Sequence, residues 1–250
     1  MALNDAWIAA VLAELARAGI DPTSWARAWA RLIPSLVLIP ALGLPAFPIP
    51  LRLAFALMLG ASVAPGLLPP ADASLPLLAT LASELARGVP VALSVAICVW
   101  GASMAGNLID ELRGASALAR SPFETGESAS PFGVLLSLAA ALAFLELGGP
   151  ARLTEALASA RPLGEQDLAA VARALAYGVR FAVVLAGPLL ALVPFVELLH
   201  ALVARTAHPI ALGVVMLPLK AITLLVAAAL LIDRFATGIV LWMDRALPSS

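Results

Sequence analysis

The chain is poor in the side chains on which most enzymes and metalloproteins depend. Its 250 residues include one cysteine, one tyrosine and two histidines, and only 12% of them are charged. A single cysteine excludes an internal disulfide, and the sequence has no zinc-protease, phosphate-binding-loop or serine-hydrolase motif. Glu197 and His200 have the spacing of a helical di-iron site, but the second copy that such a site requires is missing. The sequence therefore predicts a protein that is not an enzyme and holds no metal or cofactor.

What the sequence has in abundance is apolar surface. Hydrophobic residues make up 62% of the chain and the mean hydropathy is +1.01, while charged residues fall far below the roughly 25% of soluble domains. The apolar runs are long, rich in alanine and leucine, and without strand-like alternation. Because lipid admits only helices or closed barrels, we predict an all-α membrane protein. A net charge of −1 gives no indication of nucleic-acid binding.

Proline, glycine and charge predict how one domain over residues 1–250 is divided. We expect an amphipathic helix at 1–20, a first helical half at 21–109, a polar loop at 110–131 and a second helical half at 132–250. Together the two halves provide about six long, kinked, hairpin-forming helices, each near the ~20 residues of a bilayer crossing.

Several local expectations follow from the same patterns. Thr23 or Ser24 is expected to cap the next helix, and the arginines and tryptophans after it to form an interfacial anchor. The last apolar run is expected to be one helix from Ile210 to about Met243.

Small residues recur every four positions along the expected third helix, as Ser94, Cys98, Ala102 and Gly106. A stripe of this kind lets helix backbones approach closely in a membrane, although an alanine-rich chain also produces stripes by chance. We interpret these four residues as candidates for helix packing.

Arg52, Glu84 and Lys220 are the candidates for intersubunit or buried charge. Glu84 can pair with Arg87 three residues later, either at the membrane surface or in a functional site. Lys220 follows a proline in an apolar run, so we predict that it meets a carboxylate or helix-end carbonyls, across a subunit contact. Alternatively, its side chain extends to the membrane surface.

The polar loop interrupts two apolar runs and is longer than neighbouring helices need. Its first half is rich in small residues, which suit a narrow channel axis, while a leucine among them can exclude water. The candidate plug consists of Gly114, Ala115, Ser116, Ala117, Leu118, Ala119, Arg120, Ser121 and Pro122. The alternative is a solvated connection between helices.

Four stretches of the chain, in order, resemble the export-gate subunit of type III secretion systems, the FliR/SpaR/SctT family. The first comprises Ala30-Arg31, Pro40, Ile49-Pro50-Leu51-Arg52 and Val63-Ala64-Pro65. The second comprises Glu84-Leu-Ala-Arg-Gly88 and the run from Ala105 to Gly114. The third is Ser130-Pro131-Phe132-Gly133 with Gly148-Gly149, and the fourth is Pro209 with Leu217-Pro218-Leu219-Lys220. The chain departs from the family at Leu112 or Arg113, where glutamine is frequent, and at Ser121-Pro122, where the family often has Asp-Pro.

The resemblance implies a subunit that assembles with FliP/SctR-type and FliQ/SctS-type proteins into a protein-conducting gate for unfolded polypeptides. It also implies a multi-pass location in the bacterial inner membrane, a loop that plugs the channel, and an FlhB/SctU-type switch protein at the entrance. The Ser-Pro-x-Gly and Gly-Gly features favour the injectisome branch over the flagellar one. A small-molecule transporter is the alternative function, because scattered charges in apolar helices also mark substrate paths.

Overall fold

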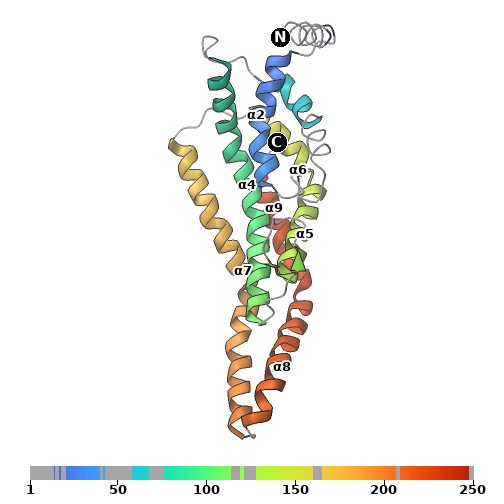
Figure 1. Cartoon of the computed structure of the whole chain (residues 1–250), viewed down its shortest axis with the longest axis vertical. Coiled ribbons are helices and arrows are strands. Elements are labelled where there is room, and N and C mark those ends of the chain that lie inside the picture. The colour runs from blue at the N-terminus through green and yellow to red at the C-terminus, as the bar shows by residue number, and fades with distance from the viewer. Residues whose placement is uncertain are drawn as a thin grey trace, which may run out of the picture.

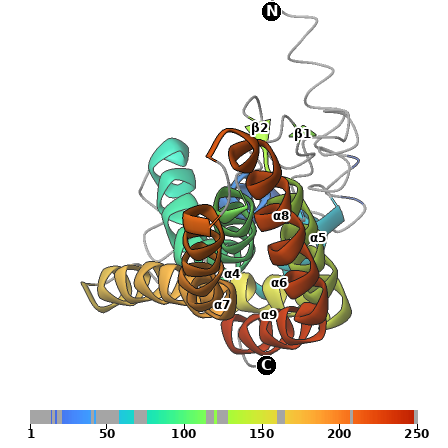
Figure 2. The same ribbon diagram turned by 90° about the horizontal axis from the view of Figure 1, so that it is seen from below.

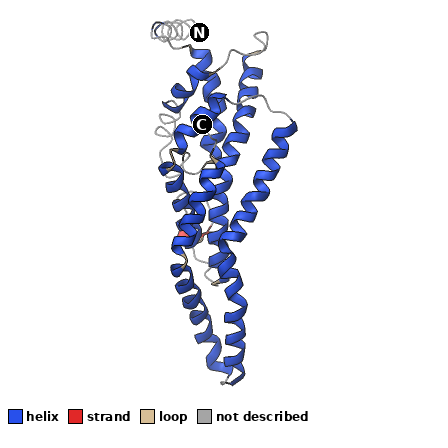
Figure 3. Ribbon diagram, turned by 180° about the vertical axis from the view of Figure 1, so that it is seen from behind, coloured by secondary structure: helices blue, strands red, loops and turns tan. Residues whose placement is uncertain are grey.

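The described part of the chain is almost entirely helical (Figure 3). The computed structural model describes residues 14, 17, 21–39, 42, 58–67, 76–113, 119–120, 128–159, 165–206 and 209–247. One antiparallel pair of two-residue strands is the exception in these ranges, with Ala119 opposite Ala129 and Arg120 opposite Ser128. The predicted all-α membrane fold is confirmed.

The elements follow one another along the chain as helices of very unequal length. They are α2 (Pro22–Leu38), a helical stretch at 58–63 that leads into η1 (Ala64–Gly66), α4 (Leu77–Leu112), β1 (Ala119–Arg120), β2 (Ser128–Ala129), α5 (Pro131–Glu146), α6 (Gly149–Ser159), α7 (Glu165–Thr206), α8 (Pro209–Leu230) and α9 (Ile232–Ala246). The expected amphipathic helix at 1–20 and the proline-rich run from Pro40 to Pro50 lie largely outside the described residues.

Helix α4 is the central element of the fold, and α2, α5, α7 and α9 pack around it (Figures 1 and 2). Its apolar residues are spread around the helix, as expected for a helix with neighbours on several sides. One continuous hydrophobic core runs from Ala28 on α2 through Val95 and Ala102 on α4 to Met243 on α9. Because these side chains come from both halves of the sequence, the polar loop lies between elements that share one core.

The first described helix begins with a cap that differs from our expectation. Asp21 is the N-cap, and its carboxylate accepts hydrogen bonds from the backbone N–H groups of Thr23 and Ser24 at 3.0 and 3.1 Å. Since the Thr23 hydroxyl also donates to this carboxylate, the pKa of Asp21 is lowered, first by the Thr23 side chain and then by its backbone N–H. The expectation that Thr23 or Ser24 caps the helix is wrong, because Pro22 occupies the first helical position and places Asp21 before it.

The last apolar run is two helices, which corrects the expected single helix from Ile210 to Met243. Helices α8 and α9 meet at Leu231 with a bend of 56°. The Leu231 N–H is shared between the carbonyls of Ala227 and Ala228, so the regular helical pattern ends there. After the bend Phe235, Ile239 and Met243 are buried. The bend interrupts the helix, and it turns the apolar face of α9 toward the hydrophobic core.

Two helices are long and apolar enough to cross a membrane, Leu77–Leu112 and Val171–Val203, by length and composition among the described residues. Two bent pairs, α5 with α6 and α8 with α9, raise the number of possible spans to four. Toward the bottom of Figure 1, α7 and α8 form a hairpin that extends beyond the other elements.

Candidate functional site

The two helices that flank the polar loop are held together by a set of side chains that we call the loop base: Asn107, Asp110, Arg113, Ser130 and Phe132. The Asp110 carboxylate accepts a hydrogen bond from the Phe132 N–H at 2.7 Å and pairs with Arg113. The guanidinium of Arg113 lies over the Phe132 ring, 4.8 Å from its centre. Asp110 is buried, so its charge is compensated inside the protein.

Local chemistry explains why the loop base forms at this position. Ser130 is the N-cap of α5 and its hydroxyl oxygen accepts from the Gly133 N–H at 2.9 Å. The same hydroxyl lies 2.5 Å from Asn107 Oδ1 on α4. The first turn of a helix presents free N–H groups and a positive dipole end, both of which a carboxylate stabilises. Asp110 therefore joins the end of α4 to the start of α5, and the polar loop leaves and returns at one place.

Gly106 allows this close approach of α4 and α5. A Cβ at position 106 would collide with the backbone of Phe132 and Gly133. No residue other than glycine leaves this space without moving a helix. The absence of a side chain at Gly106 thus allows Asn107 and Asp110 of α4 to lie within hydrogen-bond distance of Ser130 and Phe132.

The candidate plug itself is only partly described. Ala119 and Arg120 form β1. The remaining plug residues lie outside the described residues: Gly114, Ala115, Ser116, Ala117, Leu118, Ser121 and Pro122.

A second polar site is buried between α2, α4 and α6, and we call it the arginine cluster: Arg27, Arg31, Glu84 and Arg87. Arg27 Nη2 and Arg87 Nη1 lie 2.8 and 3.2 Å from Glu84 Oε1. Arg31 pairs with the other carboxylate oxygen. Arg31 Nη1 also donates to the backbone carbonyl oxygen of Leu157 on α6 at 2.6 Å. Arg31 therefore links α6 to the carboxylate that joins α2 and α4.

The arginine cluster corrects our expectation for the start of α2. Arg27 and Arg31 are 6% and 2% exposed and face Glu84, so they do not form an anchor at a membrane surface. The pairing of Glu84 with Arg87 was visible as a three-residue spacing. Arg27 and Arg31 lie more than 50 residues from Glu84 in sequence. The only sequence signal that could have suggested a common partner is their four-residue spacing, which places them on one face of the helix.

The other predicted site residues occupy separate places. Cys98, Ala102 and Gly106 are buried, whereas Ser94 is half-buried. Cys98 Sγ lies 3.7 Å from the carbonyl oxygen of Trp242 on α9, so the stripe faces more than one neighbouring helix. Arg52 lies outside the described residues.

Lys220 on α8 contacts a carboxylate of its own chain. Its Nζ lies 2.8 Å from Glu197 Oε1 on α7. This ion pair links the two helices of the extended hairpin. Glu197 is the glutamate whose spacing from His200 resembles that of a di-iron site. No group of three or more possible metal ligands occurs among the described residues.

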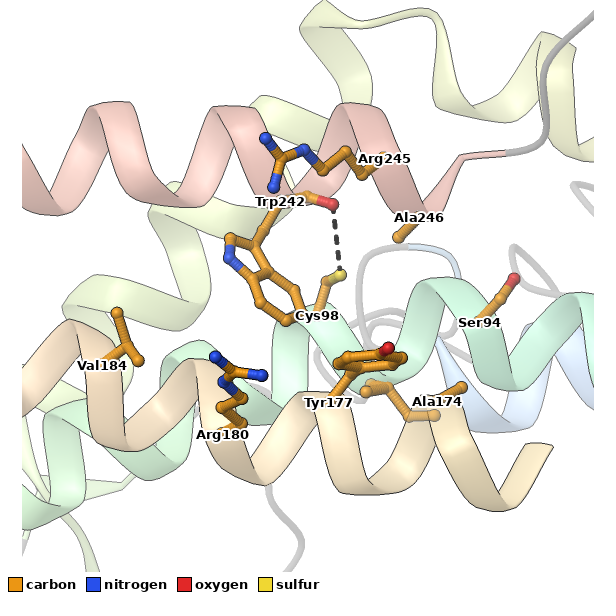
Figure 4. Close-up of a pocket in the computed structure, with 10 residues that line it drawn as sticks. Ser94, Cys98, Ala174, Tyr177, Arg180, Val184, Trp242, Arg245 and Ala246 are labelled. Atoms are coloured by element: carbon orange, nitrogen blue, oxygen red, sulfur yellow. Dashed lines mark hydrogen bonds between the residues drawn. The ribbon is translucent and has the colours of Figure 1, made fainter. Parts of the chain in front are cut away.

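A cavity of about 630 Å³ opens between α4, α7 and α9 (Figure 4). Trp242 lies within it, stacked on Phe181 with ring centres 4.7 Å apart and edge-on to Tyr177 at 6.4 Å. Arg180 of α7 and Arg245 of α9 also line it.

The fold, with its apolar helices and buried ion pairs, defines an all-α membrane protein. The family model described as bacterial export proteins, family 1, matches residues 23–245. The chain therefore belongs to this family, whose members are structural components of type III secretion and flagellar export apparatuses. A search of curated proteins gave no significant match.

Proposed function

We propose that the protein is the export-gate subunit of an injectisome-type secretion system in the bacterial inner membrane. In this function it assembles with FliP/SctR-type and FliQ/SctS-type subunits, and unfolded polypeptides pass through the resulting gate. An FlhB/SctU-type switch protein is its further partner at the entrance. The family match over residues 23–245 is the observation that carries the proposal, and the Ser-Pro-x-Gly and Gly-Gly features favour the injectisome branch.

The exposed surface of the α7–α8 hairpin supports a function within an assembly. Large apolar side chains are exposed on both helices, among them Phe195 and Leu199 on α7 and Ile222 and Leu225 on α8. Lipid or neighbouring subunits can cover such a surface, whereas water cannot without a large free-energy cost.

Co-purification tests this function. The tagged chain, extracted in mild detergent from cells that express the complete export gene set, is expected to retain both small membrane subunits through size exclusion. A tagged, unrelated inner-membrane protein of similar size is the control. A stable monomer that transports small solutes in liposomes would instead favour the transporter alternative.

We further propose that residues 114–122 form the movable plug of the gate. The loop base supports this, because it fixes the two ends of the loop against each other. Small side chains such as Ala115 and Ser116 suit a narrow axis, and a gate without large packed side chains opens at low cost.

Deletion of Ala115 to Ala119 is expected to leave assembly intact and to make the inner membrane permeable to ions and small solutes, because the constriction is lost. The measurement is uptake of a normally impermeant dye, with co-purification as the assembly control. Deletion of five residues from the acidic second half, Glu124 to Ser128, is the matched variant and should leak less. Normal assembly together with a tight membrane would show that this segment is not the plug.

A further inference from the structure

The cavity between α4, α7 and α9 combines positive charge with apolar walls. Arg180 and Arg245 supply the charge, while Ile97, Val184 and Trp242 supply apolar and aromatic surface. In Figure 4 the two arginines come from different helices and lie on either side of Trp242. A volume of about 630 Å³ is within the usual range for small-molecule sites.

Within the described part of the chain, neither arginine of the cavity has an ion-pair partner. The nearest carboxylate in sequence to Arg245, that of Asp244, pairs with Arg152 at 3.0 Å. None of the described residues that line the cavity is acidic. Two guanidinium groups at one cavity therefore favour an anion with several acceptor oxygens, and phosphate matches the planar fork of arginine best.

The position of the cavity indicates from where such an anion comes. Its walls include α4 and α7, the two helices long and apolar enough to cross a membrane. Tyr177 and Val184 of its lining are 53% and 56% exposed, so the cavity is accessible from the outer surface of the chain. Tryptophan and tyrosine are the side chains enriched at the level of lipid headgroups.

From these observations we infer that the cavity binds an anionic phospholipid, with its headgroup held by the arginines of the lining and the start of an acyl chain along Ile97, Val184 and Trp242. The remainder of the lipid stays in the bilayer, since the cavity is not enclosed. A lipid held there fills the space between α7 and α9. It also supplies negative charge, which the described lining of the cavity lacks.

Photo-crosslinking tests the inference. The full chain is reconstituted in nanodiscs that contain a trace of photoactivatable phosphatidylglycerol in phosphatidylcholine, and adducts are mapped by mass spectrometry. We expect adducts on the α7 and α9 segments that line the cavity. The double variant Arg180→Gln with Arg245→Gln should lower this labelling about tenfold, as expected for the loss of charge-assisted contacts.

Two further variants distinguish the site from general attraction to an anionic surface. Arg234→Gln removes an exposed arginine of α9 that does not line the cavity, and labelling should stay unchanged. Ala174→Trp fills the cavity while both arginines remain, and labelling should fall. Circular dichroism verifies that each variant is folded.

Four results would overturn the inference. The first is equal labelling by a phosphatidylcholine probe, and the second is a folded double variant that is labelled as strongly as the natural chain. The third is loss of labelling in the presence of excess inorganic phosphate, which would identify a site for a free anion. Protection of the cavity by a copurified export subunit would assign it to a protein carboxylate instead.

Discussion

Glu84 is a buried carboxylate that accepts hydrogen bonds from arginines on two helices. Arg27, Arg31 and Arg87 all pair with this one carboxylate. Arg31 also donates hydrogen bonds to the backbone carbonyl oxygens of Leu157 and Ala158 on α6. At the residue scale, the connection between α2 and α4 therefore depends on Glu84 more than on any one arginine.

Replacement of Glu84 by glutamine should destabilise the protein by about 3–5 kcal/mol, because it removes the negative charge with which three arginines pair in the protein interior. The measurement is the unfolding midpoint of the purified protein or complex in detergent. Glu111→Gln, at an exposed position on the same helix, is the control and should change stability by less than about 0.5 kcal/mol. Equal midpoints for the two variants would show that the cluster is not a structural connection.

At the element scale, the approach of α4 to α5 determines where the polar loop begins and ends. Gly106 permits the contact, and the hydrogen bond from the Phe132 N–H to Asp110 orients α5. Both ends of the loop are thus set by packing between helices and not by the sequence of the loop.

Gly106→Ala should destabilise the protein by about 1–3 kcal/mol, because the added methyl group collides with the α5 backbone. Gly187→Ala on α7 is the matched control, since a Cβ there meets nothing within 4 Å. Alanine favours a helix over glycine by up to about 1 kcal/mol, so the control should be neutral or stabilised. The measurement is the detergent unfolding midpoint, and a stabilised Gly106→Ala variant would contradict the packing argument.

At the scale of the whole molecule, the protein is elongated because the α7–α8 hairpin extends beyond the helices around α4 (Figure 1). The hairpin carries exposed apolar side chains and the Lys220–Glu197 ion pair. Where such a pair is surrounded by lipid or a neighbouring subunit, removal of one member leaves a charge in apolar surroundings.

Lys220→Met should therefore reduce incorporation into the export complex several-fold, and the double variant with Glu197→Gln should restore it, because both charges are then gone. The measurement is the yield of each variant in the co-purified complex. A single variant that assembles and supports secretion like the natural chain would instead support the alternative of a lysine that extends to the membrane surface.

The sequence by itself determined the class of the protein. Long apolar runs without alternation allow only helices in lipid, and proline and glycine mark where many of these helices end. The expected third helix, which carries the stripe of small residues, is present as α4. The family was also recognisable, because short motifs keep their order along the chain.

Only the tertiary structure decided which polar groups meet. Arg31 and Glu84 are distant in sequence, as are Asp110 and Phe132, and the helical period does not specify partners across such distances. The bend at Leu231 likewise could not be predicted, because the local sequence favours a continuous helix. The burial of Phe235 after the bend depends on the position of the core, which the local sequence does not specify. Hydrophobic periodicity is a local property, whereas burial and charge pairing depend on how distant helices pack.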